Sequence, residues 1–322
     1  MARVLSGIQP SGNLHIGNYF GMMKPMIERQ YENDLFCFIV NYHAMTSLHD
    51  GEELKRNTLE AAMDFLALGL DPEKCHFWVQ SEIPEVVELS WILSCHTSMG
   101  LLERSHSYKD KTSRGLTPTA GLFTYPVLMA ADILLFNADI VPVGKDQKQH
   151  LEITRDIAER FNNTFGEIFV LPEPEISEEL AVIPGVDGQK MSKSYNNALE
   201  IFESESTLKK KVMKIVTDST PVEDPKDPDK CNVFALYKLF AQEAKLDDAK
   251  ERYLKGGTGY GQFKKELLEL IVEYFRPYRE KRKIYENDPE EVRKILKKGA
   301  EKTRIEAMKV LSKVRDAVGI NY

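Results

Sequence analysis

Residues 190–194, the lysine loop, read Lys-Met-Ser-Lys-Ser and place two ammonium groups and two hydroxyls in five positions. The loop follows Gly185 and Gly188, and glycine lets a backbone turn tightly. Lysine and serine side chains on such a turn can surround a polyphosphate with positive charge and hydrogen-bond donors. The loop therefore predicts a phosphate-binding site.

Residues 9–18, the histidine segment, read Gln-Pro-Ser-Gly-Asn-Leu-His-Ile-Gly-Asn and offer a second site for an anion. The segment follows an expected strand and opens a helix, so its N–H groups and the helix dipole can face a phosphate. His15 and Asn18 lie one turn apart and can donate to phosphate oxygens, while Gly17 leaves room for a base or ribose. The alternative is a plain turn capped by Ser11 or Asn13. Together with the lysine loop, the segment favours chemistry at a nucleotide.

Residues 143–147, Val-Gly-Lys-Asp-Gln, repeat this pattern at another expected strand-to-helix junction. In open α/β sheets, ligands bind beyond the carboxyl ends of the strands. Gly144 permits close approach, Asp146 can accept from ribose hydroxyls, and Gln147 can reach a polar ligand. Asp146 could equally cap the following helix.

Asp132 stands in an otherwise apolar run, residues 125–136, and burying an unpaired carboxylate is costly. Pro126 predicts the first turn of a helix there. Tyr125, Met129 and Asp132 then share one helix face. Two interpretations stay open: Asp132 forms a structural ion pair or cap, or it accepts a hydrogen bond from an aromatic ligand in a pocket lined by Tyr125 and Met129.

The elements that must position these groups alternate between strand and helix in the first half of the chain. This rhythm predicts an α/β fold with a Rossmann-like, doubly wound parallel sheet. After the lysine loop the pattern becomes almost entirely helical, interrupted by a glycine-rich turn at 256–261. The expected strands are 4–8, 35–40, 76–79 and 138–143, and the expected helices are 16–32, 52–69, 85–99, one from about 125, and 146–162.

Composition bounds the class of protein. The 322 residues are 42% hydrophobic and 29% charged, typical of a globular protein with two domains. Four scattered cysteines indicate neither a zinc site nor a disulfide framework, and we find neither a membrane span nor a signal peptide, so the cytoplasm is expected. The net charge of −7 argues against nonspecific nucleic-acid binding. The basic segment 276–322 still permits a polyanionic partner, although a solvated helical surface explains it as well.

These motifs together resemble those of the class I aminoacyl-tRNA synthetases. The histidine segment is similar to their "HIGH" element, with Asn18 in its last position, and the lysine loop is identical to their "KMSKS" sequence. Along nearly its whole length the chain is similar to the bacterial tryptophanyl-tRNA synthetases. Further resemblance lies in residues 7–12, 18–19, 43–46, 129–135, 141–150 and 216–219.

The resemblance implies a tryptophan–tRNA ligase working in two steps. Tryptophan and ATP form tryptophanyl-adenylate and pyrophosphate, and the terminal ribose of tRNA(Trp) then takes the aminoacyl group. Mg²⁺ shares the phosphate charge and takes substrate oxygens and water, so no protein-only metal site is expected.

The site residues that the resemblance implies fall into three groups. The catalytic residues are His15, Asn18, Lys190, Lys193 and Ser194. The ATP-binding residues are Gln9, Pro10, Ser11, Gly17, Asn18, Lys111, Gly144, Lys145, Asp146, Ile183, Lys190, Met191, Ser192, Lys193 and Ser194. The tryptophan-binding residues are Asp132, which would accept from the indole N–H, with Tyr125, Met129, Gln147 and His43.

Some positions depart from the family pattern. Asn41 and Tyr42 stand where many relatives carry Asp-Gln, which puts the partners of His43 in question, and Lys145 stands where many carry Glu. Some members of a similar subgroup bind an iron–sulfur cluster through C-terminal cysteines. Only Cys231 remains here, so no cluster is expected.

Two other functions compete with tryptophan activation. A tyrosyl-tRNA synthetase would also suit Asp132, because a carboxylate accepts from a phenol O–H as readily as from an indole N–H. A noncatalytic RNA-binding paralogue is the second, and the intact His15, Asn18, Lys190 and Lys193 speak against it.

The resemblance also implies a domain division and a homodimer. A catalytic domain is expected over 1–204, with a dimer-forming insertion at about 104–170. A helical tRNA-anticodon domain would follow over 205–286, and a helical segment, 287–322, would pack back on the core. The candidate tRNA-phosphate contacts, each of which could instead be solvated surface, are Lys209, Lys210, Lys211, Lys214, Lys281, Arg282 and Lys283.

Overall fold

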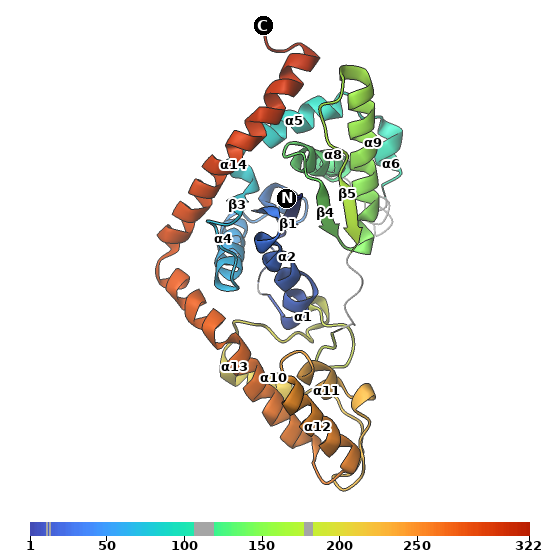
Figure 1. The fold of residues 1–322 in the computed structure, drawn as a ribbon, viewed down its shortest axis with the longest axis vertical. Helices are drawn as coiled ribbons and strands as arrows, with labels where there is room; N and C mark the ends of the chain where they lie inside the picture. Colours follow the sequence, from blue (N-terminus) through green and yellow to red (C-terminus); the bar gives the residue numbers. More distant parts are fainter. Residues whose placement is uncertain (11, 13, 106–118, 177–182) are drawn as a thin grey trace. The chain divides into compact units, whose positions relative to one another are not determined.

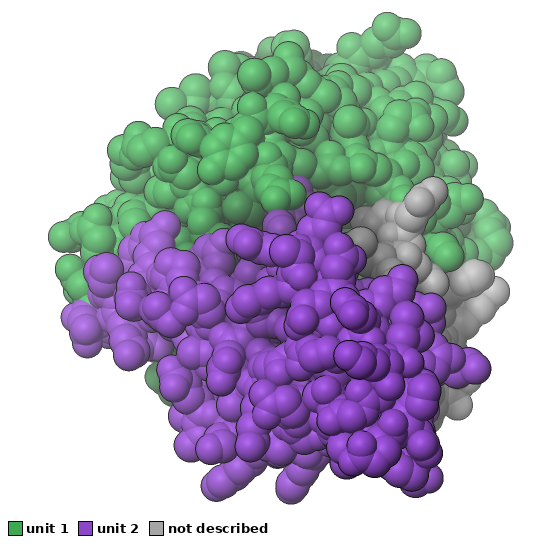
Figure 2. Space-filling model, turned by 60° about the horizontal axis from the view of Figure 1, so that its bottom comes forward, with its two compact units in different colours: residues 1–12, 26–178, 288–322 green, residues 13–25, 179–287 purple. Residues whose placement is uncertain are grey.

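The computed structural model describes the chain except for residues 11, 13, 106–118 and 177–182, and for Asp146 it describes the backbone alone. The predicted ligand contacts Ser11 and Lys111, and the side chain of Asp146, therefore lie outside the described part. The chain forms two compact units, coloured separately in Figure 2. Unit 1 comprises residues 1–12, 26–178 and 288–322, and unit 2 comprises residues 13–25 and 179–287.

A five-stranded parallel sheet forms the centre of unit 1, in the order β3-β2-β1-β4-β5 (Figure 1). Its strands are β1 (Arg3–Ile8), β2 (Asp34–Ile39), β3 (His76–Val79), β4 (Ile140–Val143) and β5 (Glu173–Ile176). The predicted parallel, doubly wound sheet and its four predicted strands are confirmed. Strand β5, with the sequence Glu-Pro-Glu-Ile, lies at the sheet edge and lacks the apolar run that reveals a buried strand.

The strand order places β1 between β2 and β4. From β1 the chain first adds β2 and then β3 on one side, and it then crosses over to add β4 and β5 on the other side of β1. Val4 makes this plain, because it pairs with Leu35 on β2 and with Ile140 on β4. Such a reversal opens a crevice at the carboxyl ends of the strands, where α/β proteins bind ligands. All strands are parallel, so these ends share one edge of the sheet.

Helices cover the sheet of unit 1, and their ends follow local signals. Asp50 caps α4 by accepting from Glu52 N–H and Glu53 N–H, and the turn after this helix contains Gly69 at φ +111°. The longer helices of this unit are α4 (Gly51–Ala67), α5 (Glu85–Ser94), α8 (Ala120–Leu134), α9 (Lys148–Phe165) and α14 (Pro289–Val318), with the short α3 (Asn41–Ala44), α6 (Met99–Glu103), η2 (Arg29–Tyr31), η3 (Gln80–Glu82) and η4 (Lys145–Gln147).

Two helix predictions in unit 1 were wrong. Pro126 does not open α8: the Thr119 hydroxyl caps this helix by accepting from Leu122 N–H, so the proline falls inside it. The single helix expected over 85–99 is two helices, because α5 ends at Ser94 and α6 begins only at Met99.

Helix α14 covers the edge strand β3 (Figure 1). At Gly299 the helix comes so close that an added Cβ would lie 1.8 Å from the Phe77 carbonyl oxygen. One turn later, Thr303 Oγ1 lies 2.9 Å from His76 Nδ1. This contact shields the free edge of the sheet, which would otherwise offer unpaired backbone groups.

Unit 2 is helical apart from the lysine loop and its flanking turns. The expected continuous helix after the histidine segment is instead α1 (Ile16–Asn18), the π-helix η1 (Tyr19–Met23) and α2 (Lys24–Glu28), which continues into unit 1. The remaining elements are η5 (Lys193–Tyr195), α10 (Glu205–Met213), η6 (Pro228–Lys230), α11 (Asn232–Tyr237), α12 (Glu243–Lys255) and α13 (Tyr260–Asn287). The predicted glycine-rich turn is confirmed between α12 and α13. Among the described residues of both units, no helix is long and apolar enough to cross a membrane.

Candidate active site

His15 and Asn18 form a reciprocal cap at the start of α1. The Asn18 backbone N–H donates to His15 Nδ1 over 3.1 Å, and the His15 N–H donates to Asn18 Oδ1 over 3.4 Å. Because Nδ1 accepts, the proton of the neutral ring sits on Nε2. The predicted donor role of His15 therefore falls to Nε2–H, and the Asn18 amide keeps its Nδ2–H donors.

The electrostatic surroundings keep His15 neutral. Burial, together with the positive charge of Lys193, lowers the pKa of His15 from 6.5 to about 4, although Glu200 acts in the opposite direction. Near neutral pH the ring can thus donate a hydrogen bond without carrying a charge. The Lys193 effect also places the lysine loop within electrostatic reach of the histidine segment, inside unit 2.

Backbone hydrogen bonds connect the histidine segment to residues 199–201, which follow the lysine loop in the chain. Ile16 N–H donates to the Leu199 carbonyl over 2.9 Å, and Ile201 N–H donates to the Leu14 carbonyl over 3.0 Å. A Cβ added to Gly17 would lie 3.0 Å from His15 Nδ1 and 3.4 Å from Met191 Cβ. The two sequence motifs, separated by about 170 residues, therefore share one frame.

The side chain of Asn197 holds the lysine loop through hydrogen bonds to its backbone. Its buried side chain accepts from Ser192 N–H over 2.7 Å and donates to Asp187 Oδ1 and the Lys190 carbonyl over 2.8 and 3.1 Å. A Cβ on Gly185 would lie only 2.4 Å from Asn197 Cγ, so this glycine is needed for space. Asn197 was missed in the sequence because nothing local to it carries a motif.

The predicted loop residues divide by exposure. Lys190, Lys193 and Ser194 are exposed, Ser192 and Ile183 are half-buried, and Met191 is buried. The Met191 N–H donates to the Ile183 carbonyl over 2.9 Å, which anchors the loop. The charged side chains thus face outward from a backbone that is held in place.

In unit 1, the predicted residues gather where the parallel strands end. Gln9 follows β1, His43 lies in α3 after β2, and Gly144 follows β4. Gln9, Gly144 and Lys145 are exposed, Pro10 is buried, and Gln147 is half-buried in η4. Gln80, which follows β3 directly, occupies the equivalent place at the end of this edge strand.

Asp132 is only 3% exposed and has two side-chain partners from this edge. His43 Nε2 lies 2.8 Å from Asp132 Oδ2, and Gln80 Nε2 donates to Oδ1 over 2.9 Å and to Oδ2 over 2.8 Å. Burial raises the pKa of Asp132, while the hydrogen bonds from His43 and Gln80 act to lower it. Asp132 therefore has the partners that a structural carboxylate needs, and it remains a candidate acceptor for a ligand.

Two other predicted pocket residues, Tyr125 and Met129, lie on α8 with Asp132. Tyr125 packs edge-on to His43 with ring centroids 6.2 Å apart, and its hydroxyl makes a short hydrogen bond to His150 Nε2. Met129 is half-buried against the apolar core of unit 1. His150 and Gln80 carry no recognisable motif and were not predicted from the sequence, although His150 lies within the 141–150 stretch on which the resemblance rests.

Asn41 and Tyr42, which depart from the family pattern, take part in holding His43. Asn41 Nδ2 donates to Ser81 Oγ over 2.8 Å, and Ser81 N–H donates back to Asn41 Oδ1 over 3.1 Å. Tyr42 N–H donates to Gln80 Oε1 over 3.0 Å. These bonds tie the junction after β2 to the junction after β3.

We predict that two histidines make the protein less stable in mild acid. Burial, then the charge of Lys302, lowers the pKa of His76 to about 4, as burial and Lys193 do for His15. The unfolded chain binds these protons near pH 6.5 and the folded form only near 4, so stability is complete above pH 6.5 and is lost as pH falls toward 4.

Urea unfolding at pH 7.5, 6.0 and 5.0 measures this dependence. His76→Gln should flatten the loss of unfolding free energy on acidification, because the titrating group is gone. His49→Gln, at an exposed position, is the matched control and should keep the wild-type slope. An unchanged slope in His76→Gln would contradict the prediction.

Comparison with known proteins places this site in a family. The model for tRNA synthetases class I (W and Y) matches residues 1–276. The chain belongs to the class I tRNA synthetases (W and Y). This assignment confirms the resemblance based on the histidine segment and the lysine loop.

Members of this synthetase family align with almost the whole chain. The tryptophan–tRNA ligase of Campylobacter jejuni is 57% identical over 318 residues, which cover 99% of this chain and 100% of the relative. That of Fusobacterium nucleatum is 53% identical over 321 residues, covering 99% and 98%. The crystal structure of the Campylobacter jejuni tryptophanyl-tRNA synthetase complexed with ADP and tryptophan matches with a TM-score of 0.95 and 57% identity, covering 98% of this chain and 99% of that one.

Proposed function

We propose that this synthetase is a tryptophan–tRNA ligase, which activates L-tryptophan with ATP and transfers it to tRNA(Trp). The observation that carries the proposal is that His15 and Asn18 share one frame with the lysine loop in unit 2. The charge of Lys193 acts on His15, and a Cβ on Gly17 would lie 3.4 Å from Met191 Cβ. Such a frame suits a reaction at a triphosphate. The 57% identity to the Campylobacter jejuni ligase supports tryptophan as the amino acid.

In the first step, a carboxylate oxygen of tryptophan forms a bond to the α-phosphorus of ATP. The bond from that phosphorus to the bridging oxygen of the β-phosphate breaks, and pyrophosphate leaves with the electron pair. No covalent enzyme intermediate is needed, so positioning and charge stabilisation supply the catalysis. Lys190, Lys193 and Ser194 are the groups we assign to the β- and γ-phosphates.

His15 and Asn18 supply donors that do not change the charge of the site. His15 Nε2–H remains neutral near pH 7, because burial and Lys193 lower the pKa of this histidine to about 4. We assign both side chains, with Gly17, to the phosphate and ribose of ATP. Gln9, Pro10, Ser11, Lys111, Gly144, Lys145, Asp146, Ile183, Met191 and Ser192 complete the proposed ATP contacts.

Mg²⁺ is the proposed charge partner of the triphosphate. Within the described ranges, no group of three or more His, Cys, Asp or Glu side chains is gathered to hold a metal ion. The side chains proposed for the triphosphate are lysines, serines, His15 and Asn18, and they leave the metal ion to take phosphate oxygens and water as its ligands, as Mg²⁺ usually does. The exposed Lys190 and Lys193 would share the phosphate charge with it.

The tryptophan pocket is assigned to unit 1. Asp132 would accept from the indole N–H, His43 and Tyr125 would border the ring, and Met129 and Gln147 would complete the contacts. Exchange of labelled pyrophosphate into ATP, with each amino acid in turn, tests the proposal. Tryptophan should stimulate exchange; stimulation by tyrosine alone would make the enzyme a tyrosyl-tRNA synthetase, and no exchange would favour a noncatalytic paralogue.

The second step transfers tryptophan from the adenylate to the terminal ribose of tRNA, releasing AMP. We assign anticodon binding to the helices of residues 205–286 and catalysis to residues 1–204. We propose that the enzyme works in the cytoplasm. Lys209, Lys210, Lys214 and Lys283 are exposed and available for tRNA phosphates. Arg282 is 4% exposed and paired with Glu286, so its prediction as a surface contact was wrong.

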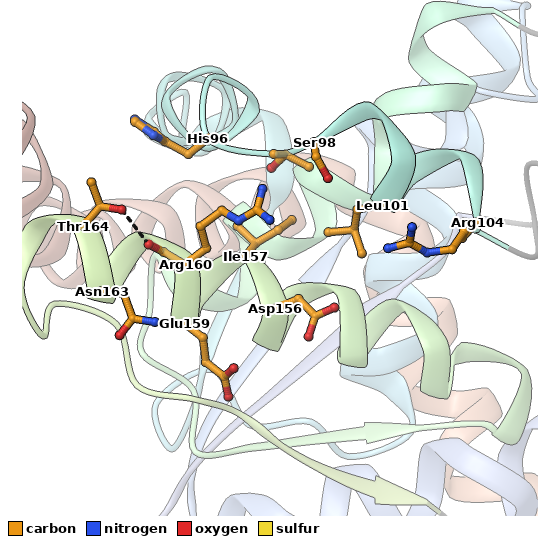
Figure 3. A pocket seen from close by; sticks show the side chains of 11 residues that line it. His96, Ser98, Leu101, Arg104, Asp156, Ile157, Glu159, Arg160, Asn163 and Thr164 are labelled. Atoms are coloured by element: carbon orange, nitrogen blue, oxygen red, sulfur yellow. Dashed lines mark hydrogen bonds between the residues drawn. The ribbon is translucent and has the colours of Figure 1, made fainter.

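We further propose a homodimer whose interface includes α9, within the predicted insertion of residues 104–170, and extends to α5 and α6, which precede that insertion. Val87 and Trp91 share one face of α5, and Trp91 is 73% exposed. A pocket of about 400 Å³ opens between the turn after α5, the helix α6 and the helix α9 (Figure 3). Arg104 and Arg160 line it together with Asp156 and Glu159, and such mixed charge suits the self-complementary contact of a two-fold dimer.

Trp91→Glu is expected to dissociate this dimer, because it places a charge in the apolar part of the interface. Light scattering should give twice the 36.8 kDa chain mass for the wild type and a single chain mass for the variant. Ile284→Glu, an exposed apolar position in unit 2, is the matched control and should remain dimeric. A dimeric Trp91→Glu would place the interface elsewhere.

A further inference from the structure

Gln80 occupies a position that no motif assigns. It is the first residue after β3, begins η3, and is 1% exposed. Its Nε2 lies 2.9 and 2.8 Å from the two oxygens of Asp132. A fully buried amide that contacts both oxygens of a buried carboxylate does more than fill space.

The orientation of the Gln80 amide follows from the hydrogen bond that its oxygen accepts. Gln80 Oε1 lies 3.0 Å from the backbone nitrogen of Tyr42, which can only donate. The oxygen must therefore face Tyr42, and the NH₂ group must face Asp132. Gln80 thus presents only donors to the carboxylate.

The acceptor positions of Asp132 can then be counted. A carboxylate has about four lone-pair sites, two on each oxygen. A nitrogen almost equidistant from both oxygens lies near the bisector of the carboxylate and uses the inner site of each. His43 uses the outer site of Oδ2, at 2.8 Å. Among the described residues, no partner is placed at the outer site of Oδ1, which is left for a ligand.

We propose that Gln80 is a positioning residue for amino-acid selection: it fixes the rotation of the Asp132 carboxylate so that one acceptor site, on Oδ1, is presented to the indole N–H. This rests on the proposed function, in which Asp132 accepts from that N–H. Without Gln80 the carboxylate can rotate about its Cβ–Cγ bond, and the ligand must compete for an acceptor that is no longer held in place.

A ligand that lacks the indole N–H distinguishes a loss of Asp132 positioning from a general disturbance of the pocket. The test uses tryptophan and its analogue in which sulfur replaces the indole N–H, both assayed by pyrophosphate exchange. Gln80→Met should raise the KM for tryptophan about tenfold, the effect of one hydrogen bond, and leave the KM for the analogue nearly unchanged. Gln30→Met, at a buried glutamine of unit 1 whose amide donates to the Gly69 carbonyl and accepts from Asp71 N–H, is the matched control and should affect both amino acids equally or neither. An equal loss for both in Gln80→Met would overturn the inference.

Gln80→Glu provides a second readout if the methionine variant folds poorly. One oxygen of the glutamate can still accept from Tyr42 N–H, while the other meets Asp132. In this variant the preference for tryptophan over the sulfur analogue should fall at high pH, where two carboxylates face each other. It should recover as pH falls, because a shared proton restores a donor to Asp132. His43 and Tyr125 also face this carboxylate, so each pH point is taken relative to the wild type. A ratio independent of pH would contradict the positioning role.

Asp132→Asn in the same assay distinguishes failure of the inference from failure of the proposed function. If Asp132→Asn affects tryptophan more than the analogue and Gln80→Met does not, Asp132 reads the indole without help from Gln80. If Asp132→Asn affects both equally, the proposed role of Asp132 is itself wrong.

Discussion

Lys193→Ala is expected to lower the kcat of tryptophan-dependent pyrophosphate exchange by about 10²–10³-fold, the usual cost of losing one preorganised group that stabilises developing charge. Pyrophosphate gains negative charge as it leaves, and the Lys193 ammonium is exposed on a loop held by Asn197. The KM for tryptophan should change little, because the lysine is assigned to the phosphates.

The control for this variant is Lys245→Ala, which removes an exposed lysine from α12 in the same unit and should leave exchange unchanged. Titration of His15 offers a second readout. The charge of Lys193 helps to lower the pKa of His15, so this pKa should rise in the variant, as followed by NMR. Normal exchange by a folded Lys193→Ala protein would remove the lysine loop from the mechanism.

Asp132→Asn is expected to raise the KM for tryptophan by about 10- to 150-fold. A hydrogen bond to a charged group contributes about 1.5–3 kcal/mol, and the substitution removes the charge while keeping the shape. It also introduces an NH₂ group among donors, because Gln80 and His43 already direct N–H groups at this side chain. An asparagine cannot accept from both and also from an indole.

Asp247→Asn, an exposed position on α12, is the matched control and should keep the wild-type KM. The KM for ATP should also stay near its wild-type value in Asp132→Asn, since Asp132 is assigned to the amino acid alone. An unchanged KM for tryptophan would mean that Asp132 is a structural carboxylate, the alternative that its spacing in the sequence left open.

Local patterns were sufficient for most of the sheet. The continuous apolar run at 35–40 and the short run at 76–79 became β2 and β3, because strands buried on both faces need apolar side chains throughout. The same rule failed for β5, whose Glu-Pro-Glu-Ile sequence has no such run. The start of α8 was also predicted wrongly from Pro126, because the Thr119 cap that begins this helix lies several residues before the proline.

The lysine loop and the histidine segment were identifiable from sequence because each carries its chemistry within a few consecutive residues. What the sequence could not provide was the set of bonds that hold them. Asn197 lies outside both motifs, yet its side chain makes hydrogen bonds to the loop backbone at Ser192 and Lys190. A lone asparagine has no local signature, so only the folded loop reveals its role.

By itself, the sequence determined the kind of chemistry, since the residue types that bind a triphosphate stand together along the chain, and it singled out Asp132 as a costly carboxylate in an apolar helix. Only the tertiary structure decided which side chains that carboxylate contacts. His43 and Gln80 are 89 and 52 residues away from it, and they meet it because parallel strands β2 and β3 end at the same edge of the sheet. Strand order is set by packing over the whole unit, which no local spacing records.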